Sequence, residues 1–324
     1  MYLFYSILLL NVIFADYGGG YAGSGLRYSS NAREFSLSGA TITDKTPGFI
    51  AFSNPALLIF VRKKYLGISI QKMSLDRSIQ SLSLETRLPP NAGLSLAILR
   101  SGTNNIIGRD SNNGVISESF SFQEIEGVIS FGISIGLNLS LGISIKVLFP
   151  SFHNLKNIKA SGNGIASDFG LIYRINSRFL IGTLIKNQYA SYNWKILLGQ
   201  DEQSNKEILP KNYIIGMSYT GFKNANIYIQ EDIIISPKND VNYRMRIGTE
   251  YKLQNRMKIR AGILQTTGAI QNNLNSSTTN FKPTFGLGTP IKVWNKYYIT
   301  LDYALDTGNV GEGLSHLFSF SLNY

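Results

Sequence analysis

Alternation of apolar and polar residues with a period of two dominates this chain from about residue 65 to its end. Residues 243–252 read Tyr-Arg-Met-Arg-Ile-Gly-Thr-Glu-Tyr-Lys, so the apolar side chains and most of the charges fall on opposite sets of alternate positions. Successive side chains of a strand point to opposite faces, which makes one face of such a strand apolar and the other ionic. The pattern predicts an all-β fold and leaves open which face is the inside.

The connections between the predicted strands indicate which face is inside. Short connections alternate with longer polar ones, and nearly all of the long ones fall at the same end. Bacterial outer-membrane barrels have an even strand number, tight periplasmic turns and long outer loops. We therefore predict a 14-stranded antiparallel transmembrane β-barrel with its apolar face toward lipid. The strands are expected at 64–72, 79–88, 92–100, 119–135, 139–149, 164–174, 179–187, 212–220, 225–234, 243–252, 257–264, 283–293, 297–304 and 316–324.

The composition agrees with a membrane barrel. Charged residues make up 16% of the 324 residues, whereas a soluble domain carries about 25%. No apolar run beyond the N-terminus reaches the roughly 18 residues that a membrane helix needs, and a spanning chain without such helices must close its backbone hydrogen bonds between strands. The net charge is +11, but the basic residues are scattered along the sequence, so nucleic acid is not expected as a partner.

The first residues resemble a secretory signal peptide. An apolar run ends at Ala15 and a polar, Gly-rich stretch follows, although no Lys or Arg precedes the run. An uncleaved anchor is the alternative. We expect export to the bacterial outer membrane, with a signal peptide at 1–15, an N-terminal hatch or plug at 16–62 and the barrel at 63–324.

The ionic faces of the strands indicate a filled lumen. A charge on the lipid face costs about 2–4 kcal/mol near mid-bilayer, so these side chains must face inward or lie at the rims. Both signs are interspersed, which favours pairing over the single-signed lining of an ion-selective pore. Residues 18–60 lack strand alternation and are moderately apolar, so they are a candidate plug; a disordered periplasmic tail is the alternative. The expected lumen charge network comprises Lys146, Asp168, Arg244, Arg246, Glu250, Arg260 and Asp302.

The N-terminal segment also resembles a known family. The runs Ala32–Ala40 and Phe52-Ser53-Asn54-Pro55-Ala56-Leu57 are similar to the N-terminal motif of the PorV/PorQ proteins. The Asn-Pro-Ala element is shared with the long-chain fatty acid transporter (FadL-like) barrels. Weaker matches follow in order at 141–146, 168–173, 248–251 and 301–304, whereas the outer loops are shorter than in PorV-type proteins. The resemblance implies fourteen strands around an N-terminal hatch, with Asn54, Pro55 and Ala56 as hatch residues.

The resemblance implies two roles. FadL-like barrels pass hydrophobic molecules, and PorV-like members accompany cargo or the translocon of type IX secretion. Our first hypothesis is a conduit for small hydrophobic compounds, the second is a secretion accessory, and an open porin is the third. The partners expected are outer-membrane lipid and either a hydrophobic small molecule or a secretion-system protein. The outer-membrane assembly machinery is a further expected partner, because the last strand ends on the aromatic Tyr324.

Catalysis is not expected. The chain has no Cys and two His: His153 lies near Ser151, and His316 follows Ser315. Adjacent residues of a strand point to opposite faces, so Ser315 and His316 are poorly placed to bond each other, and catalysis needs a positioned nucleophile and base or a metal. We therefore expect no enzymatic activity, no metal site and no cofactor.

Overall fold

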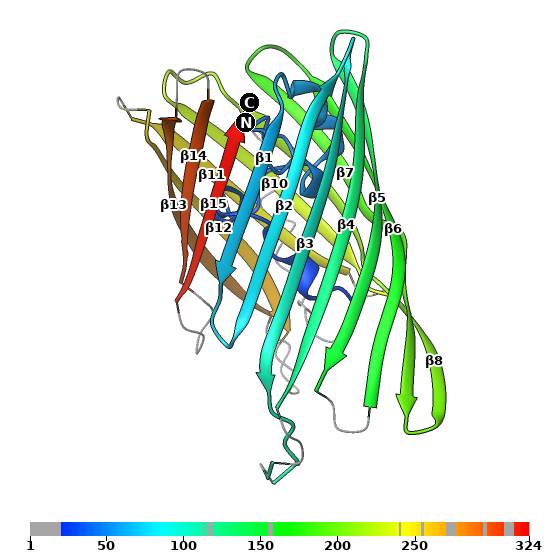
Figure 1. The fold of residues 1–324 in the computed structure, drawn as a ribbon. Coiled ribbons are helices and arrows are strands. Elements are labelled where there is room, and N and C mark those ends of the chain that lie inside the picture. Colours follow the sequence, from blue (N-terminus) through cyan, green and yellow to red (C-terminus); the bar gives the residue numbers. More distant parts are fainter. Residues whose placement is uncertain are drawn as a thin grey trace.

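The computed structural model is a single antiparallel sheet curled around an N-terminal segment (Figure 1). It describes residues 21–112, 114–115, 119–154, 158–239, 241–253, 256–269, 277–293, 297–307 and 314–323. The expected signal peptide at 1–15 lies outside the described residues. The strands are β1 (Tyr65–Lys72), β2 (Arg77–Leu88), β3 (Ala92–Ile106), β4 (Phe120–Ile135), β5 (Leu139–His153), β6 (Ile158–Arg174), β7 (Phe179–Leu198), β8 (Asp201–Ile208), β9 (Lys211–Tyr219), β10 (Ala225–Ile235), β11 (Val241–Lys252), β12 (Lys258–Ala269), β13 (Ser277–Val293), β14 (Tyr297–Asp306) and β15 (Ser315–Asn323).

Fourteen of these strands form a closed ring. β1 pairs with both β2 and β15, so the two ends of the barrel sequence meet. β7 pairs with β6 and with β9, which closes the ring on its other side. Among the described residues β8 pairs with β7 alone and extends that strand as a hairpin outside the ring, so the 15-stranded sheet holds a 14-stranded barrel. The predicted fold class is confirmed.

The two ends of the barrel differ as expected. We call the end that holds the connections near residues 89, 137, 177 and 222 the short-turn end; β1 begins there and β15 ends there. The opposite, long-loop end carries the β3–β4 connection and the β7–β8 hairpin, which extend beyond the other strands at the bottom of Figure 1. The even strand number returns the last strand to the end where the first begins.

Several strands continue past their predicted ends into segments expected to be loops. The segment 188–211 was predicted to be a loop and instead holds the second half of β7 and all of β8. Likewise, β5 ends at His153 and β6 starts at Ile158, within the expected loop 150–163. These extensions lie toward the long-loop end, where no lipid demands an apolar outer face. Along the extension of β7 the buried side chains are therefore the apolar Tyr192 and Trp194, and the polar Asn193 and Lys195 are exposed. Asn187 and Tyr189 also have positive φ (59° and 60°), which interrupts the period in the middle of β7.

Side chains sort to the two faces as the alternation predicted. On β4 and β5 the exposed residues include Ile129, Phe131, Ile143 and Ile145, while the serines between them are buried. Strands of a membrane barrel alternate in this way between lipid and lumen. Within the described part of the chain, no helix has the length and apolarity to cross a membrane.

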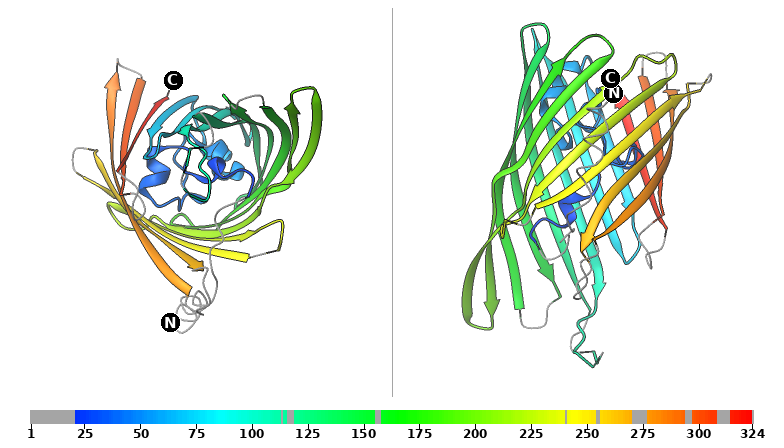
Figure 2. Two further views of the ribbon diagram at one scale, coloured as in Figure 1. Left: turned by 90° about the horizontal axis from the view of Figure 1, so that it is seen from below. Right: turned by 180° about the vertical axis from the view of Figure 1, so that it is seen from behind.

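The lumen is occupied by residues 21–61, which we call the plug segment. Figure 2 shows this segment inside the ring of strands when the barrel is seen from below. It contains four short helical turns: η1 (Gly25–Arg27), α2 (Ala32–Ser36), η2 (Ile50–Phe52) and η3 (Pro55–Phe60). Ala32, Leu37, Leu57 and Leu58 are fully buried between the plug segment and the wall.

Candidate functional site: the plugged lumen

Local sequence sets the two anchoring turns of the plug segment. The Asn31 side chain accepts a hydrogen bond from the Glu34 backbone N–H (2.9 Å), and the Glu34 carboxylate in turn accepts one from the Ser30 N–H (2.8 Å). This reciprocal capping fixes the start of α2. At η3, Asn54 caps the turn by accepting from the Ala56 N–H (3.0 Å), and Pro55 occupies the first position, where its missing N–H costs nothing.

Asn54 also ties the plug segment to the wall. Its Nδ2 atom donates to the carbonyl of Ile42 (3.2 Å) and, at 3.4 Å, to the carbonyls of Leu171 on β6 and Thr183 on β7. The side chain is completely buried. One amide therefore joins two parts of the plug segment to two strands, and each of its polar atoms has a partner.

A row of wall glycines forms the seat for η3. Gly93, Gly132, Gly142 and Gly170 are register partners on β3, β4, β5 and β6. A Cβ atom on any of them would overlap an atom of residues 54–58: Leu58 O, Pro55 O, Ala56 N and Asn54 Oδ1, respectively. Glycine in a strand interior permits such a close approach of another backbone. The row lets the plug segment lie directly on the sheet.

A second glycine seat supports the end of α2. Gly248 on β11 pairs with Gly262 on β12, and a Cβ on either would lie within 3 Å of Leu37 or Ser38 atoms. Beside this seat, Ser38 Oγ lies 2.8 Å from Thr284 Oγ1 on β13. The plug segment thus touches opposite arcs of the barrel through small residues on the wall.

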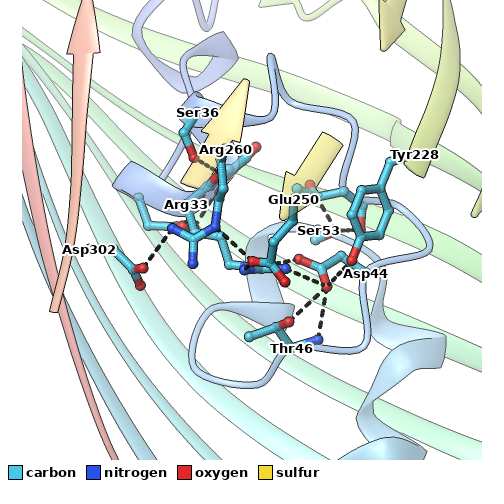
Figure 3. Close-up of polar contacts among 12 residues, drawn as sticks. Arg33, Ser36, Asp44, Thr46, Ser53, Tyr228, Glu250, Arg260 and Asp302 are labelled. Carbon is cyan, nitrogen blue, oxygen red and sulfur yellow. Dashed lines mark hydrogen bonds and ion pairs between the residues drawn. The ribbon is translucent and has the colours of Figure 1, made fainter. Parts of the chain in front are cut away.

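Buried ion pairs join the plug segment to the wall around Arg33 (Figure 3). Arg33 Nε lies 2.6 Å from Asp44 Oδ2, and its Nη1 contacts Glu250 on β11. Glu250 also pairs with Arg260 (2.8 Å), and Arg260 pairs with Asp302 (2.7 Å). Burial lowers the pKa of Arg33, but Asp44 and Glu250 raise it by more, so this pKa lies above its usual value and the guanidinium stays charged.

The other expected charge residues form separate groups. Lys146 lies 2.7 Å from Asp168 and 3.2 Å from Glu126. Arg246 pairs with Asp232 at 2.8 Å and also donates to the Ser38 carbonyl (2.7 Å). Arg244 lines the same cavity as Lys146 and Arg246. The seven residues predicted from sequence therefore face the lumen side but are divided among three groups, two of which include the plug segment.

Two wall carboxylates accept hydrogen bonds from backbone N–H groups of the plug segment. Glu85 on β2 accepts hydrogen bonds from Gly48 (2.7 Å) and Ile50 (2.5 Å). Glu124 on β4 accepts from Gly25 (2.9 Å) and from the Tyr192 hydroxyl (3.0 Å). In the reverse sense, Lys186 Nζ donates to the Phe52 carbonyl (2.8 Å). These two carboxylates and the plug-segment N–H groups that face them are satisfied in this way.

An aromatic cleft opens at the long-loop end of the lumen. Phe122, Phe152, Tyr192 and Trp194 line it together with Ala160 and Ile196, and its volume is about 380 Å³. The polar residues Glu124, Asn205 and Glu207 complete the lining. The Phe152 ring centroid lies 4.7 Å from that of Phe122 and 5.7 Å from that of Trp194. The first described residues of the plug segment, 21–24, form its floor.

Two smaller cavities lie further along the lumen. The middle cavity, of about 110 Å³, shares Gly23 with the aromatic cleft and is lined mostly by polar side chains, including Lys146 and Arg246. The cavity toward the short-turn end, of about 180 Å³, contains Arg33 and Asp302, and it shares Glu34 with the middle one. The plug segment separates the three spaces.

Sequence reasoning missed the glycine seats, the aromatic cleft and the role of Arg33. A repeated pattern in the sequence could have revealed the glycines: Phe-Gly-Ile-Ser at 131–134 and Leu-Gly-Ile-Ser at 141–144 place their glycines at paired positions of β4 and β5. The aromatic cleft could have been recognised from Tyr192, Trp194 and Ile196, which occupy alternate positions of β7, but these residues fall in a segment expected to be a loop. Nothing local to Arg33 indicated its wall partner, which lies 217 positions away.

The histidines do not assemble a recognisable catalytic group. Ser315 is buried and His316 is exposed, as the alternation predicted. Ser151 Oγ and His153 Nε2 lie 3.1 Å apart at the exposed end of β5. Within the described ranges, no three His, Cys, Asp or Glu residues are grouped so that they could hold a metal ion.

The closed ring, the apolar exterior and the occupied lumen define the class of this protein as an outer-membrane-type β-barrel with an internal plug. No protein-family model matches the chain. No curated protein matches it either. Solved structures do match, and they include a FadL homologue and several hydrocarbon transporters.

Three of these structures illustrate the similarity. A FadL homologue of Pseudomonas aeruginosa has a TM-score of 0.67 and 11% sequence identity, over 92% of this chain and 98% of that one. The Ralstonia pickettii toluene transporter TbuX gives a TM-score of 0.66 and 11% identity, over 91% and 98%. The Pseudomonas putida toluene transporter TodX gives 0.62 and 14%, over 91% and 96%. The chain therefore has a FadL-like fold.

Proposed function

We propose that this chain is an outer-membrane conduit for small hydrophobic compounds and that the plug segment is its movable part. The observation that carries the proposal is the aromatic cleft, which opens at the long-loop end and has the start of the plug segment as its floor. The structures with the same fold include two toluene transporters and CymD, a monoaromatic hydrocarbon channel. These names support a hydrophobic substrate for this chain as well.

The size and lining of the cleft fit a small aromatic molecule. An apolar cavity of roughly 150 Å³ is large enough to bind benzene, and the cleft offers about 380 Å³ beside a cluster of aromatic rings. Aromatic pairs favour offset-stacked or edge-to-face contacts over a face-to-face sandwich, and the rings of Phe152 and Trp194 are tilted by 33° relative to each other. A planar hydrocarbon can extend this stack.

Onward passage requires the plug segment to move. The middle cavity, at about 110 Å³, is smaller than the roughly 150 Å³ that accommodates benzene, and its lining is polar. In this proposal Asn54, Pro55 and Ala56 anchor the plug segment. The lumen charge groups close the path around it. Displacing the plug segment would join the three spaces.

A reversible disulfide tests the requirement for movement. The chain has no cysteine, and Ser38 Oγ lies 2.8 Å from Thr284 Oγ1, so the pair Ser38→Cys/Thr284→Cys can link the plug segment to β13. Cells that express the full chain are assayed for uptake of radiolabelled toluene. We expect the oxidised double variant to lose uptake and reductant to restore it, while Ser38→Cys alone is unaffected. Uptake no greater than in cells without the chain would refute the conduit, and unchanged uptake by the locked variant would refute plug movement.

A secretion accessory is the second candidate, and the β7–β8 hairpin favours it. β8 is exposed along its length and pairs only with β7 in the described part of the chain, so one backbone edge faces outward at the long-loop end. Such an edge can bind a strand of a partner. The PorV/PorQ resemblance and a type IX partner belong to this candidate. Purification from native membranes distinguishes the two functions, since an accessory would retain a large partner.

An open porin is the third candidate, and the filled lumen counts against it. The plug segment blocks the axis with buried residues, and the ionic side chains are paired rather than lining a channel. An open porin predicts a large single-channel conductance in planar bilayers. We also propose that the outer-membrane assembly machinery binds the last strand. The outward side chains of this strand include Phe318 and Phe320.

A further inference from the structure

Charge is distributed unequally between the two ends of the barrel. The exposed carboxylate residues among those described are Asp76, Asp110, Asp201 and Glu202, and all four lie at the long-loop end. The exposed basic residues of the short-turn end form what we call the basic ring: Arg62, Lys63, Lys64, Arg87, Arg178, Lys223, Lys252, Arg256 and Lys292. These residues are scattered along the sequence, and the strand order gathers them at one end.

The sequence of the short-turn connections shows the same bias. The connections at 62–64, 88–91, 136–138, 175–178, 220–224, 252–257 and 293–296 contain no Asp or Glu. The long-loop end, in contrast, mixes both signs on exposed positions, with Lys195 beside Glu202, for example (3.4 Å). The asymmetry is therefore not a general consequence of the basic composition.

The basic ring surrounds the barrel rather than forming one patch. In sheet order, basic residues precede β1 and lie near the β2–β3, β6–β7, β9–β10, β11–β12 and β13–β14 connections. The β4–β5 connection is the exception, because it carries no basic residue. A soluble protein would contact one side of the rim. A ring of this kind instead matches a charged layer that encircles the barrel.

Exposed aromatic residues place the basic ring at the edge of the hydrocarbon layer. Phe222 is 53% exposed and precedes Lys223, and Tyr251 is 50% exposed and precedes Lys252. Tyr173 and Tyr297 are exposed at the same end. Aromatic girdles of membrane proteins lie at the headgroup level, so the bases beside them reach the phosphate layer.

The ring also lacks counter-charges within the described part of the protein. No ion pair is formed there by Lys63, Lys64, Lys223, Arg256 or Lys292. Uncompensated like charges repel one another, and phosphate oxygens are good acceptors for both Lys and Arg. We propose that the basic ring binds anionic phospholipid headgroups in the leaflet at the short-turn end, independently of what passes through the lumen.

Lipid selectivity of the reconstituted full chain tests this proposal. Spin-labelled phosphatidylglycerol and phosphatidylcholine are compared at the protein surface in neutral vesicles at low salt. We expect the wild type to prefer the anionic lipid by about fivefold, the effect of one base near an anionic surface, and to lose the preference in high salt. The ring variant carries Lys63→Gln, Lys64→Gln, Lys223→Gln, Arg256→Gln and Lys292→Gln, and it should lose most of the preference for the anionic lipid.

A variant of the opposite end provides the matched control. It carries Lys72→Gln, Lys159→Gln, Lys195→Gln, Lys206→Gln and Lys238→Gln, which remove the same number of exposed charges. The control should keep the selectivity of the wild type. Equal loss in both variants, or no selectivity and no salt dependence in the wild type, would overturn the proposal. So would ring-dependent binding of soluble polyglutamate without lipid selectivity, because the ring would then be a surface for an acidic protein.

Discussion

Asn54 of the plug segment lies directly over Gly170 of β6, with its Oδ1 atom in the space that a Cβ of residue 170 would occupy. The same amide donates to carbonyls of β6 and β7. The wall is thus shaped to receive this one side chain. Two predictions follow from the contact, one for each partner.

Gly170→Ala should unseat η3. The added methyl group overlaps Asn54, and neither the backbone of β6 nor the fully buried amide can move away freely. Overpacking of this kind costs about 1–3 kcal/mol, and we expect the plug segment to become sensitive to protease while the barrel stays folded. Gly102→Ala on β3 is the control, because its Cβ would meet its nearest atom at an ordinary 3.6 Å. If both variants resist protease like the wild type, the glycine row is not a seat.

Asn54→Asp should loosen the plug segment without changing its size. The Nδ2 atom donates to three carbonyls, and a carboxylate oxygen in its place would leave these buried acceptors facing a negative charge. Loss of buried hydrogen-bond partners costs about 1–3 kcal/mol for each group left unsatisfied. We expect channel openings in planar bilayers to become more frequent. Asn91→Asp, at an exposed turn where Nδ2 donates to Ser134, should leave the conductance unchanged.

The sequence predicts those parts of the fold that lipid constrains. Within the membrane, one face must be apolar, so alternation locates the strands and their number, and β4 or β11 appear close to their expected ends. Beyond the membrane this constraint disappears, and the alternation rule therefore predicts a loop where β7 continues and pairs with β8.

The site depends on contacts that no local pattern encodes. Arg33 lies 11 positions from Asp44 but 217 from Glu250, and its importance follows only from their meeting in the lumen. The inward charges could be recognised one by one, because their period is local. Their division into three groups could not, since it depends on where the plug segment rests.

Arg33 and Glu250 should be strongly coupled in the stability of the folded barrel. Removing one partner of a buried ion pair costs about 3–5 kcal/mol, because the other charge is left uncompensated. We expect Arg33→Met and Glu250→Gln each to lower the free energy of unfolding, and the double variant to lose much less than the two together. Denaturant titration of vesicle-embedded protein measures the free energy of unfolding of the wild type, the two single variants and the double variant. The exposed pair Lys195–Glu202, with side chains 70% and 51% exposed, provides the comparison and should couple by less than about 1 kcal/mol. Additive losses at Arg33 and Glu250 would show that the pair does not hold the plug segment.

Phe152→Ala should weaken binding of toluene in the aromatic cleft. Phe152 lies between the rings of Phe122 and Trp194, so its removal takes away one wall of the stack and admits water. A stacked aromatic contact is worth about 0.5–1.5 kcal/mol beyond its buried area, and the upper end of this range corresponds to an affinity loss of about tenfold. The chain has two tryptophans, so in a Trp294→Phe background the fluorescence of Trp194 reports on the cleft alone. Toluene titration of the purified barrel should change this fluorescence in the parent and require about tenfold more ligand in Phe152→Ala.

Phe149→Ala, on the exposed face of the same strand, should titrate like the parent. An unchanged affinity in Phe152→Ala would move the binding site out of the cleft and remove the main support for the proposed conduit.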